Sequence, residues 1–113
     1  MPARAILVAL VLSVSGQAFA DCKEPEIGSK NFPSLSPPLS EVVIGSGRLQ
    51  FYSAPNLNCS MPGVFVIPRD ELIAYAQSDD GWSSVMYSNH KTGGTVLGWV
   101  KSSRLKATGT VGH

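Results

Sequence analysis

The sequence predicts an all-β fold, and three observations support this prediction. Short segments rich in Val, Ile, Tyr, Phe and Trp recur along the chain from residue 41 onward. Clusters of Gly, Pro, Asn and Asp separate these segments at intervals of about 8 to 12 residues, a spacing typical of β-sandwiches and small barrels. No segment carries the apolar repeat of an amphipathic helix. A chain of 113 residues then forms one small β-domain.

Six strands are predicted from these segments, and they span residues 41–44, 48–53, 63–67, 71–78, 82–88 and 96–101. The clearest turns have the sequences SDDG and NHKTGG, because Asp, Asn and Gly favour turn geometry. Ser83 and Ser84 follow one another within a predicted strand. The pattern therefore does not decide which face of that strand points inward.

The first 20 residues have the organisation of a cleavable signal peptide. Arg4 precedes an apolar stretch of about ten residues, and the small-residue pattern Ala18-Phe19-Ala20 follows it. This stretch is about half of the roughly 20 residues that a membrane-spanning helix needs, so a stable membrane insertion is not expected. A lipoprotein would carry Cys at its first mature position, where this chain has Asp21. The sequence predicts a soluble periplasmic or secreted protein.

Residues 21–47 are expected to form an extended arm in front of the domain, with a short strand at its end. Four prolines in this segment remove amide donors and oppose a regular helix: Pro25, Pro33, Pro37 and Pro38. A polyproline ligand at Ser36-Pro37-Pro38 is the alternative, but a single Pro pair is a weak signal. An extended spacer is the favoured interpretation.

The two cysteines of the chain, Cys22 and Cys59, are expected to form a disulfide. An even number of cysteines in a small exported protein favours a bond over free thiols. Closing a loop of roughly 38 residues stabilises a fold by about 4 kcal/mol in the chain-entropy model. A catalytic thiolate is disfavoured, because the histidines are His90, in a predicted turn, and His113, at the last position. The bond would tie the arm to the domain.

The charges of the chain are balanced overall but unevenly placed. Removing residues 1–20 removes Arg4 and leaves eight basic and eight acidic side chains, so no basic surface for nucleic acid is expected. Residues 91–106 nevertheless hold four cations and no acid, whereas residues 69–80 hold four acids against Arg69 alone. The molecule is therefore expected to be neutral and locally polarised.

Three segments between residues 49 and 105 have a familiar pattern. They read LQFYSAP at 49–55, DDGWSSVMY at 79–87 and GWVKSSRL at 98–105. In this order they resemble the opening strand, the hairpin strand and the closing strand of the bacterial SH3-like (SH3b) family. The resemblance implies a small, partly open β-barrel of five or six strands over residues 48–106, followed by a tail at 107–113. Tyr52 and Ala54 stand where the family usually has Arg and Gly, which changes the surface of the first loop.

Members of this family commonly bind peptides of the bacterial cell wall or accompany wall hydrolases. The resemblance therefore implies a non-enzymatic module that contacts peptidoglycan peptide or a wall-associated protein. The candidate ligand-binding residues are Tyr52, Trp82, Tyr87, Lys101 and Arg104. Aromatic rings are frequent binding hot spots, and Lys and Arg bind carboxylates. In the alternative interpretation the charges form an ordinary solvated rim and the rings form the core.

A second hypothesis is a stand-alone inhibitor or immunity protein that blocks a periplasmic toxin or a cell-wall hydrolase. Small size, export and a disulfide suit it equally well. Proline-rich ligands are disfavoured, because Lys101 and Arg104 stand where eukaryotic SH3 domains place groove Pro and Tyr. No cofactor or metal is expected, since Asp79-Asp80 is typical of a turn and His90 alone makes no metal site. Gly93-Gly94 lacks the Lys of a phosphate loop.

Overall fold

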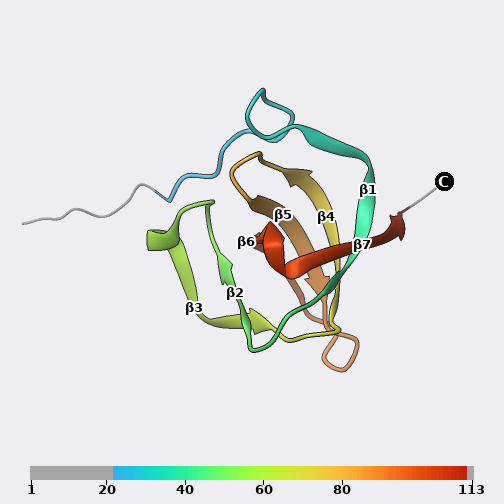
Figure 1. Ribbon diagram of the computed structural model, residues 1–113. Helices are drawn as coiled ribbons and strands as arrows, with labels where there is room; N and C mark the ends of the chain where they lie inside the picture. The colour runs from blue at the N-terminus through green and yellow to red at the C-terminus, as the bar shows by residue number, and fades with distance from the viewer. Residues whose placement is uncertain (1–21, 112–113) are drawn as a thin grey trace, which may run out of the picture.

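The computed structural model describes residues 22–111, so the predicted signal peptide lies outside the described residues. This part of the chain is all-β, and its strands form one antiparallel sheet in the order β3-β2-β6-β5-β4-β1-β7 (Figure 1). The strands are β1 (Ser34–Val43), β2 (Leu49–Tyr52), β3 (Ser60–Val66), β4 (Glu71–Gln77), β5 (Trp82–Ser88), β6 (Thr95–Lys101) and β7 (Leu105–Thr110). Two short 3₁₀ helices of the described residues connect strands that are consecutive in the chain: η2 (Leu57–Cys59) joins β2 to β3, and η3 (Ser102–Arg104) joins β6 to β7.

The sheet rolls around the core without closing into a barrel. Figure 1 shows the strands curling around one another, and β3 and β7 remain as the two edges. The all-β prediction is confirmed. Seven strands are present among the described residues, and five of them, β2 to β6, lie wholly within residues 48–106, where five or six were expected. No helix within residues 22–111 combines the length and apolarity that crossing a membrane requires.

The core lies on the inner face of the rolled sheet. Its buried side chains come from all strands except β7, and they are Val43, Leu49, Phe51, Val66, Leu72, Ala74, Val85 and Val100. Side chains alternate between the two faces of a strand. Because Phe51 and Val100 point inward, their chain neighbours Tyr52 and Trp99 point outward.

The pairing of β5 with β6 is regular and decides the orientation that the sequence pattern left open. Trp82 lies opposite Lys101 and Ser84 lies opposite Trp99, so these four side chains share the outer face. Ser83 is buried on the inner face, where its hydroxyl lies 2.6 Å from the hydroxyl of Ser102. The outer face is therefore lined by the even-numbered residues of β5.

Strand β1 corrects the prediction of a long arm in front of the domain. Residues 34–40 belong to a ten-residue strand that lies between β4 and β7. The β1–β4 register shifts between Ser34 and Leu39, and Pro37 and Pro38 lie in this irregular stretch. Proline has no backbone N–H, and in this irregular stretch β1 makes no regular pairs with β4, so Pro37 and Pro38 interrupt no regular β1–β4 hydrogen bond. The Ser36–Pro37 peptide bond is cis, and only residues before 34 form an arm.

Strand β7 corrects the prediction of a tail after residue 106. Its sequence LKATGT has little apolar pattern, yet it pairs with β1 from Leu105 to Thr110. The register changes between Ser40 and Glu41, and the hydroxyl of Thr108 in this bulge donates to the carbonyl of Ser40 at 3.1 Å. Pairing with a free strand edge, rather than burial of apolar side chains, makes this segment a strand.

Candidate functional site

Three of the predicted ligand-binding residues meet on the outer face of β2, β5 and β6. The rings of Tyr52 and Trp82 are in edge-to-face contact, with centroids 4.9 Å apart and planes at 85°. The ammonium Nζ of Lys101 lies 4.6 Å from the centroid of the Trp82 ring. The register explains this arrangement, because Lys101 is directly opposite Trp82 and β2 adjoins β6. We call Tyr52, Trp82 and Lys101 the aromatic–cation cluster.

Within the aromatic–cation cluster the three side chains have different accessibility. Trp82 is buried, whereas Tyr52 and Lys101 are half-buried. Lys101 Nζ makes no hydrogen bond to a side chain or backbone group of residues 22–111. Its attraction to the ring face still leaves N–H donors for an external acceptor. The cluster can therefore present a positioned cation to a carboxylate, with Trp82 beneath it.

The N-terminal arm covers the neighbouring part of the same outer face. Phe32 contacts Trp99 edge to face with ring centroids 5.4 Å apart, and the Trp99 indole donates to Glu24 Oε1 at 3.0 Å. The predicted disulfide is confirmed: Cys22 and Cys59 are bonded, with their Cα atoms 5.6 Å apart. Trp99 is fully buried although it points away from the core. The position of the arm, which the sequence did not determine, is thus over Trp99.

Arg104 has a different role in the geometry from the other predicted ligand residues. Its guanidinium donates to the carbonyl oxygens of Ile44 at 2.6 Å and Gly47 at 2.8 Å. A Cβ atom at Gly45 would lie 2.6 Å from Arg104 Nε, so glycine permits this close approach. The hydrogen bonds of Arg104 organise the 44–48 turn, and they do not connect it to the aromatic–cation cluster.

Tyr87 lies on the inner face of β5, opposite Val96, whereas Trp82 lies on the outer face. It packs against the core and lines a hollow of about 330 Å³ together with Val64 and Phe65 of β3. The structure therefore places Tyr87 apart from the aromatic–cation cluster.

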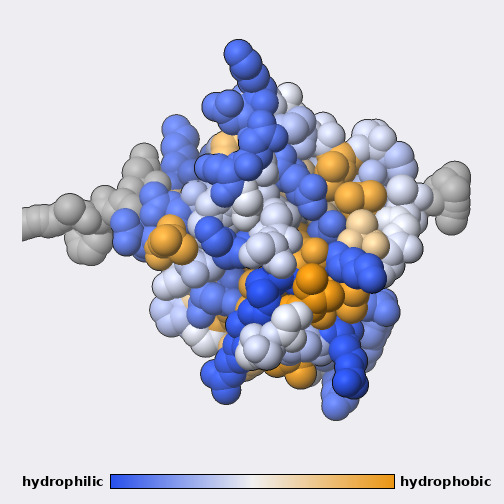
Figure 2. Space-filling view, in the orientation of Figure 1, coloured by the Kyte–Doolittle hydropathy of each residue, from blue (hydrophilic) through white to orange (hydrophobic). Residues whose placement is uncertain are grey.

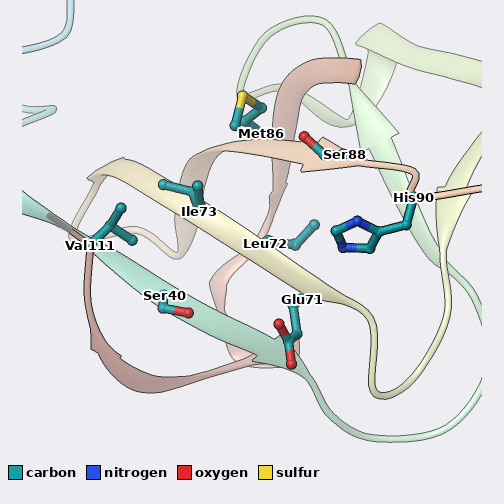
Figure 3. Close-up of a pocket in the computed structure, with 8 residues that line it drawn as sticks. All are labelled: Ser40, Glu71, Leu72, Ile73, Met86, Ser88, His90 and Val111. Atoms are coloured by element: carbon teal, nitrogen blue, oxygen red, sulfur yellow. The ribbon is translucent and has the colours of Figure 1, made fainter. Parts of the chain in front are cut away.

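A second hollow, of about 310 Å³, lies over β1, β4 and β5 on the outer face (Figure 3). Ser40, Ile73 and Met86 follow one another across the three strands in direct register. Glu71 and His90 also line it, and Figure 3 shows the His90 ring directed toward β4. The apolar side chains can accept an apolar group, and the Glu71 carboxylate can pair with a cation beside it.

Sequence reasoning missed this outer-face hollow for a specific reason. The sequence pattern places Ser40 in the arm and therefore does not reveal the row formed across the sheet by Ser40, Ile73, Met86 and Leu97, which we call the outer-face row. The available signal was that Ile73, Met86 and Leu97 are apolar although their strands already provide core residues on the opposite face. Apolar side chains on both faces of a strand predict a second covered or interacting surface.

Glu41 is a carboxylate on the inner face of β1 with 3% of its surface exposed. Gln77 Nε2 donates to its Oε2 at 3.2 Å, and its Oε1 has no hydrogen-bond partner among the described residues. Burial raises the pKa of Glu41, and the hydrogen bond from Gln77 opposes this rise. Glu41 is thus an incompletely satisfied buried acid.

The acidic turn after β4 has the structure expected of a turn. Ser78 donates a hydrogen bond to the carboxylate of Asp80, and the amide of Ser78 donates to the carbonyl of Trp82. Within residues 22–111, no group of three or more His, Cys, Asp or Glu side chains is placed to hold a metal ion.

Comparisons with protein-family models, with curated proteins and with solved structures give no match.

Proposed function

We propose that this protein is a non-enzymatic, exported binding module of the SH3-like type that contacts peptidoglycan peptide or a wall-associated protein. The observation that carries the proposal is the position of Lys101 Nζ, 4.6 Å from the Trp82 ring centroid. The chain order of β2, the β5–β6 hairpin and η3 supports the SH3-like assignment, since it follows the three resembling segments. The Cys22–Cys59 bond supports an oxidising, exported location.

The aromatic–cation cluster suits a ligand that carries carboxylates, as peptidoglycan peptides do. The Trp82 ring restricts the position of the flexible Lys101 side chain before the ligand arrives. A restricted side chain loses less conformational entropy on binding, so more of the ion-pair energy contributes to affinity. Tyr52 adds a half-buried ring and a hydroxyl beside it. Trp82 positions the cation, whereas Lys101 and Tyr52 would touch the ligand.

The test is co-sedimentation of residues 21–113 with purified peptidoglycan sacculi at low and high salt. Lys101→Ala is expected to weaken retention roughly tenfold, which corresponds to the loss of one hydrogen bond to a charged group. Lys91→Ala is the matched control, because it removes an equal charge from the exposed 89–94 turn. Absence of retention at both salts, or an equal loss in the two variants, would contradict the proposal.

A second candidate function is that of an inhibitor or immunity protein that blocks a toxin or a wall hydrolase. The observation that favours it is the outer-face row, in which Leu97, 66% exposed, lies opposite Met86, and Met86 lies opposite Ile73 beside the 310 Å³ hollow. Apolar surface with a polar rim is typical of protein interfaces. The test is inhibition of a purified wall hydrolase. Leu97→Asp should abolish inhibition, and Lys101→Ala should preserve it.

A further inference from the structure

One end of the rolled sheet is formed by two turns that are far apart in the sequence. Residues 44–48 connect β1 to β2, and residues 67–70 connect β3 to β4; Figure 1 shows both at the same end of the sheet. The amide of Val43 donates to the carbonyl of Asp70 at 2.9 Å, and the amide of Arg69 donates to the carbonyl of Val43 at 2.8 Å. These bonds hold the two turns side by side. We call this end, made of the two turns and the adjoining residues Phe65, Glu71 and Arg104, the basic tip.

The basic tip exposes large apolar side chains. Ile44, Phe65 and Ile67 are 38%, 36% and 50% exposed, and they make up half of the six exposed large apolar residues in the described chain. Ile44 and Ile67 stand at the beginnings of the two turns. Figure 2 shows apolar surface bordered by strongly hydrophilic surface in the lower half of the view. Exposed apolar groups gathered at one end indicate an interaction surface.

Two arginine side chains lie beside these apolar groups. Arg48 Cζ lies 4.2 Å from the centroid of the Phe65 ring, and Arg104 is held on the 44–48 turn. The carboxylate of Asp70 accepts the Ile67 amide at 2.9 Å, which occupies it within its own turn. Glu71 follows at the start of β4. With Arg69, the basic tip holds three arginines against these two acids.

Arg69 adopts a backbone conformation that normally favours glycine. Its φ is 80°, and among the described residues it is the non-glycine residue with a positive φ. Its side chain is exposed and makes no hydrogen bond or ion pair within residues 22–111. This conformation costs free energy that glycine would avoid, and such strain concentrates at functional positions. A strained residue with a free guanidinium therefore points to a contact outside the fold.

We infer that the basic tip adsorbs to an anionic lipid surface, with Ile44 and Ile67 at the boundary of headgroups and acyl chains and Arg48 and Arg69 against lipid phosphates. Apolar side chains combined with a cationic fringe are what peripheral membrane binding requires. Ile44 and Ile67 are exposed side chains on turns, so they can enter between lipid headgroups. A protein partner would instead need a cavity on this surface to receive its own side chain. The inference does not depend on the aromatic–cation cluster, which uses other residues.

The experiment is sedimentation of residues 21–113 with two kinds of vesicle. One contains phosphatidylglycerol mixed with phosphatidylcholine, and the other contains phosphatidylcholine alone. Binding is expected to the anionic vesicles at low salt and to fall at about 1 M salt, where the screening length is roughly 3 Å. No binding to the anionic vesicles, or equal binding to both, would overturn the inference. Binding to polyglutamate without binding to vesicles would assign the basic tip to an acidic protein and also overturn it.

Two variants separate a binding role from a structural one. Arg69→Gly is expected to weaken vesicle binding roughly fivefold, while it raises the melting temperature because glycine accepts the positive φ. Ile67→Ser should weaken binding roughly tenfold. Leu97→Ser is the control, since Leu97 is more exposed but lies on β6 in the outer-face row, outside the two turns of the basic tip. Vesicle binding unchanged in Arg69→Gly and Ile67→Ser, or an equal loss in Leu97→Ser, would overturn the assignment. Lys101→Ala should retain vesicle binding, because Lys101 is not part of the basic tip. The vesicle experiment therefore tests the basic tip even if the protein does not bind sacculi.

Discussion

Phe32 of the N-terminal arm meets Trp99 of β6 edge to face, with the ring centroids 5.4 Å apart and the planes at 80°. Trp99 points away from the core, and this contact together with the indole hydrogen bond to Glu24 encloses it. The arm therefore supplies a second apolar layer on the outer face of the sheet. Its residues belong to the folded unit and are not a spacer in front of it.

Phe32→Ala should reduce the free energy of unfolding by about 2 kcal/mol. This loss is smaller than that for the same substitution at a fully buried Phe, because Phe32 is only half-buried. The change exposes Trp99 to water, so tryptophan emission should shift to longer wavelength in the folded variant. Denaturant titration and fluorescence measure the two effects. Phe65→Ala, at the exposed basic tip, serves as the control and should leave the emission unchanged. An unaltered emission in Phe32→Ala would show that the arm does not cover Trp99 in solution.

The paired substitution of Cys22 and Cys59 by Ser should reduce the free energy of unfolding by about 4 kcal/mol. The bond joins residues separated by 37 positions, and opening it increases the entropy of the unfolded chain. Chemical denaturation of the variant and of the oxidised protein gives the difference, and mass spectrometry with and without reductant verifies the bond. Equal stability of the two proteins would argue against a structural disulfide.

Glu41→Gln should raise the free energy of unfolding at pH 7 by about 1 kcal/mol, because it removes a charge from a buried position with one unpaired oxygen. The folded-state pKa of Glu41 is raised above its ordinary value of 4.5. Its favourable contribution is therefore fully present below about pH 4.5 and is lost as the pH rises through the folded-state pKa. The stability difference between the variant and the original protein should widen over that range and then stay constant.

Measuring both proteins at several pH values isolates Glu41, because every other acidic group is common to the two. A stability difference that does not vary with pH would show that the Glu41 carboxyl titrates normally. Glu71→Gln, an exposed carboxylate at the start of β4, is the control and should leave stability nearly unchanged.

Arg104→Ala should lower the free energy of unfolding by about 1–2 kcal/mol, since two carbonyls of the 44–48 turn lose their charged donor. Arg104→Lys should recover only part of this loss, because an ammonium cannot span the same two oxygens as a planar guanidinium. Lys101→Ala should change stability less. Thermal unfolding of the three variants makes the comparison. Equal melting temperatures of Arg104→Ala and Lys101→Ala would contradict the structural role of Arg104. Arg104 would then again be a candidate for direct ligand binding.

The sequence predicted the central strands well for a clear reason. Residues 82–88 form β5 as expected, and β4 and β6 differ from their predicted ranges by a single residue at one end. Their β-branched and aromatic residues lie between Gly- and Asp-containing turns, so local preference and tertiary pairing agree. Prediction failed at β1, whose prolines fall in a register shift, and at β7, whose sequence has little apolar pattern. Both segments become strands through pairing with strands distant in the chain.

The candidate site shows the same division. Aromatic and cationic residue types identified Tyr52, Trp82 and Lys101, and the register of β2, β5 and β6 brings them together. The same criteria included Arg104, which hydrogen-bonds to a distant turn, and Tyr87, which faces inward. Residue type indicates what a side chain can bind, but the strand register decides its neighbours and its face.

By itself, the sequence determined the all-β class, the pairing of Cys22 with Cys59 and the strands of the central sheet, because each depends on local composition or on a unique partner. Only the tertiary structure decided that the arm covers Trp99, that Glu41 is buried beside Gln77, and that two distant turns form the basic tip. These relationships join residues far apart in the chain. Their geometry follows from how the rolled sheet aligns its strands, which no local pattern encodes.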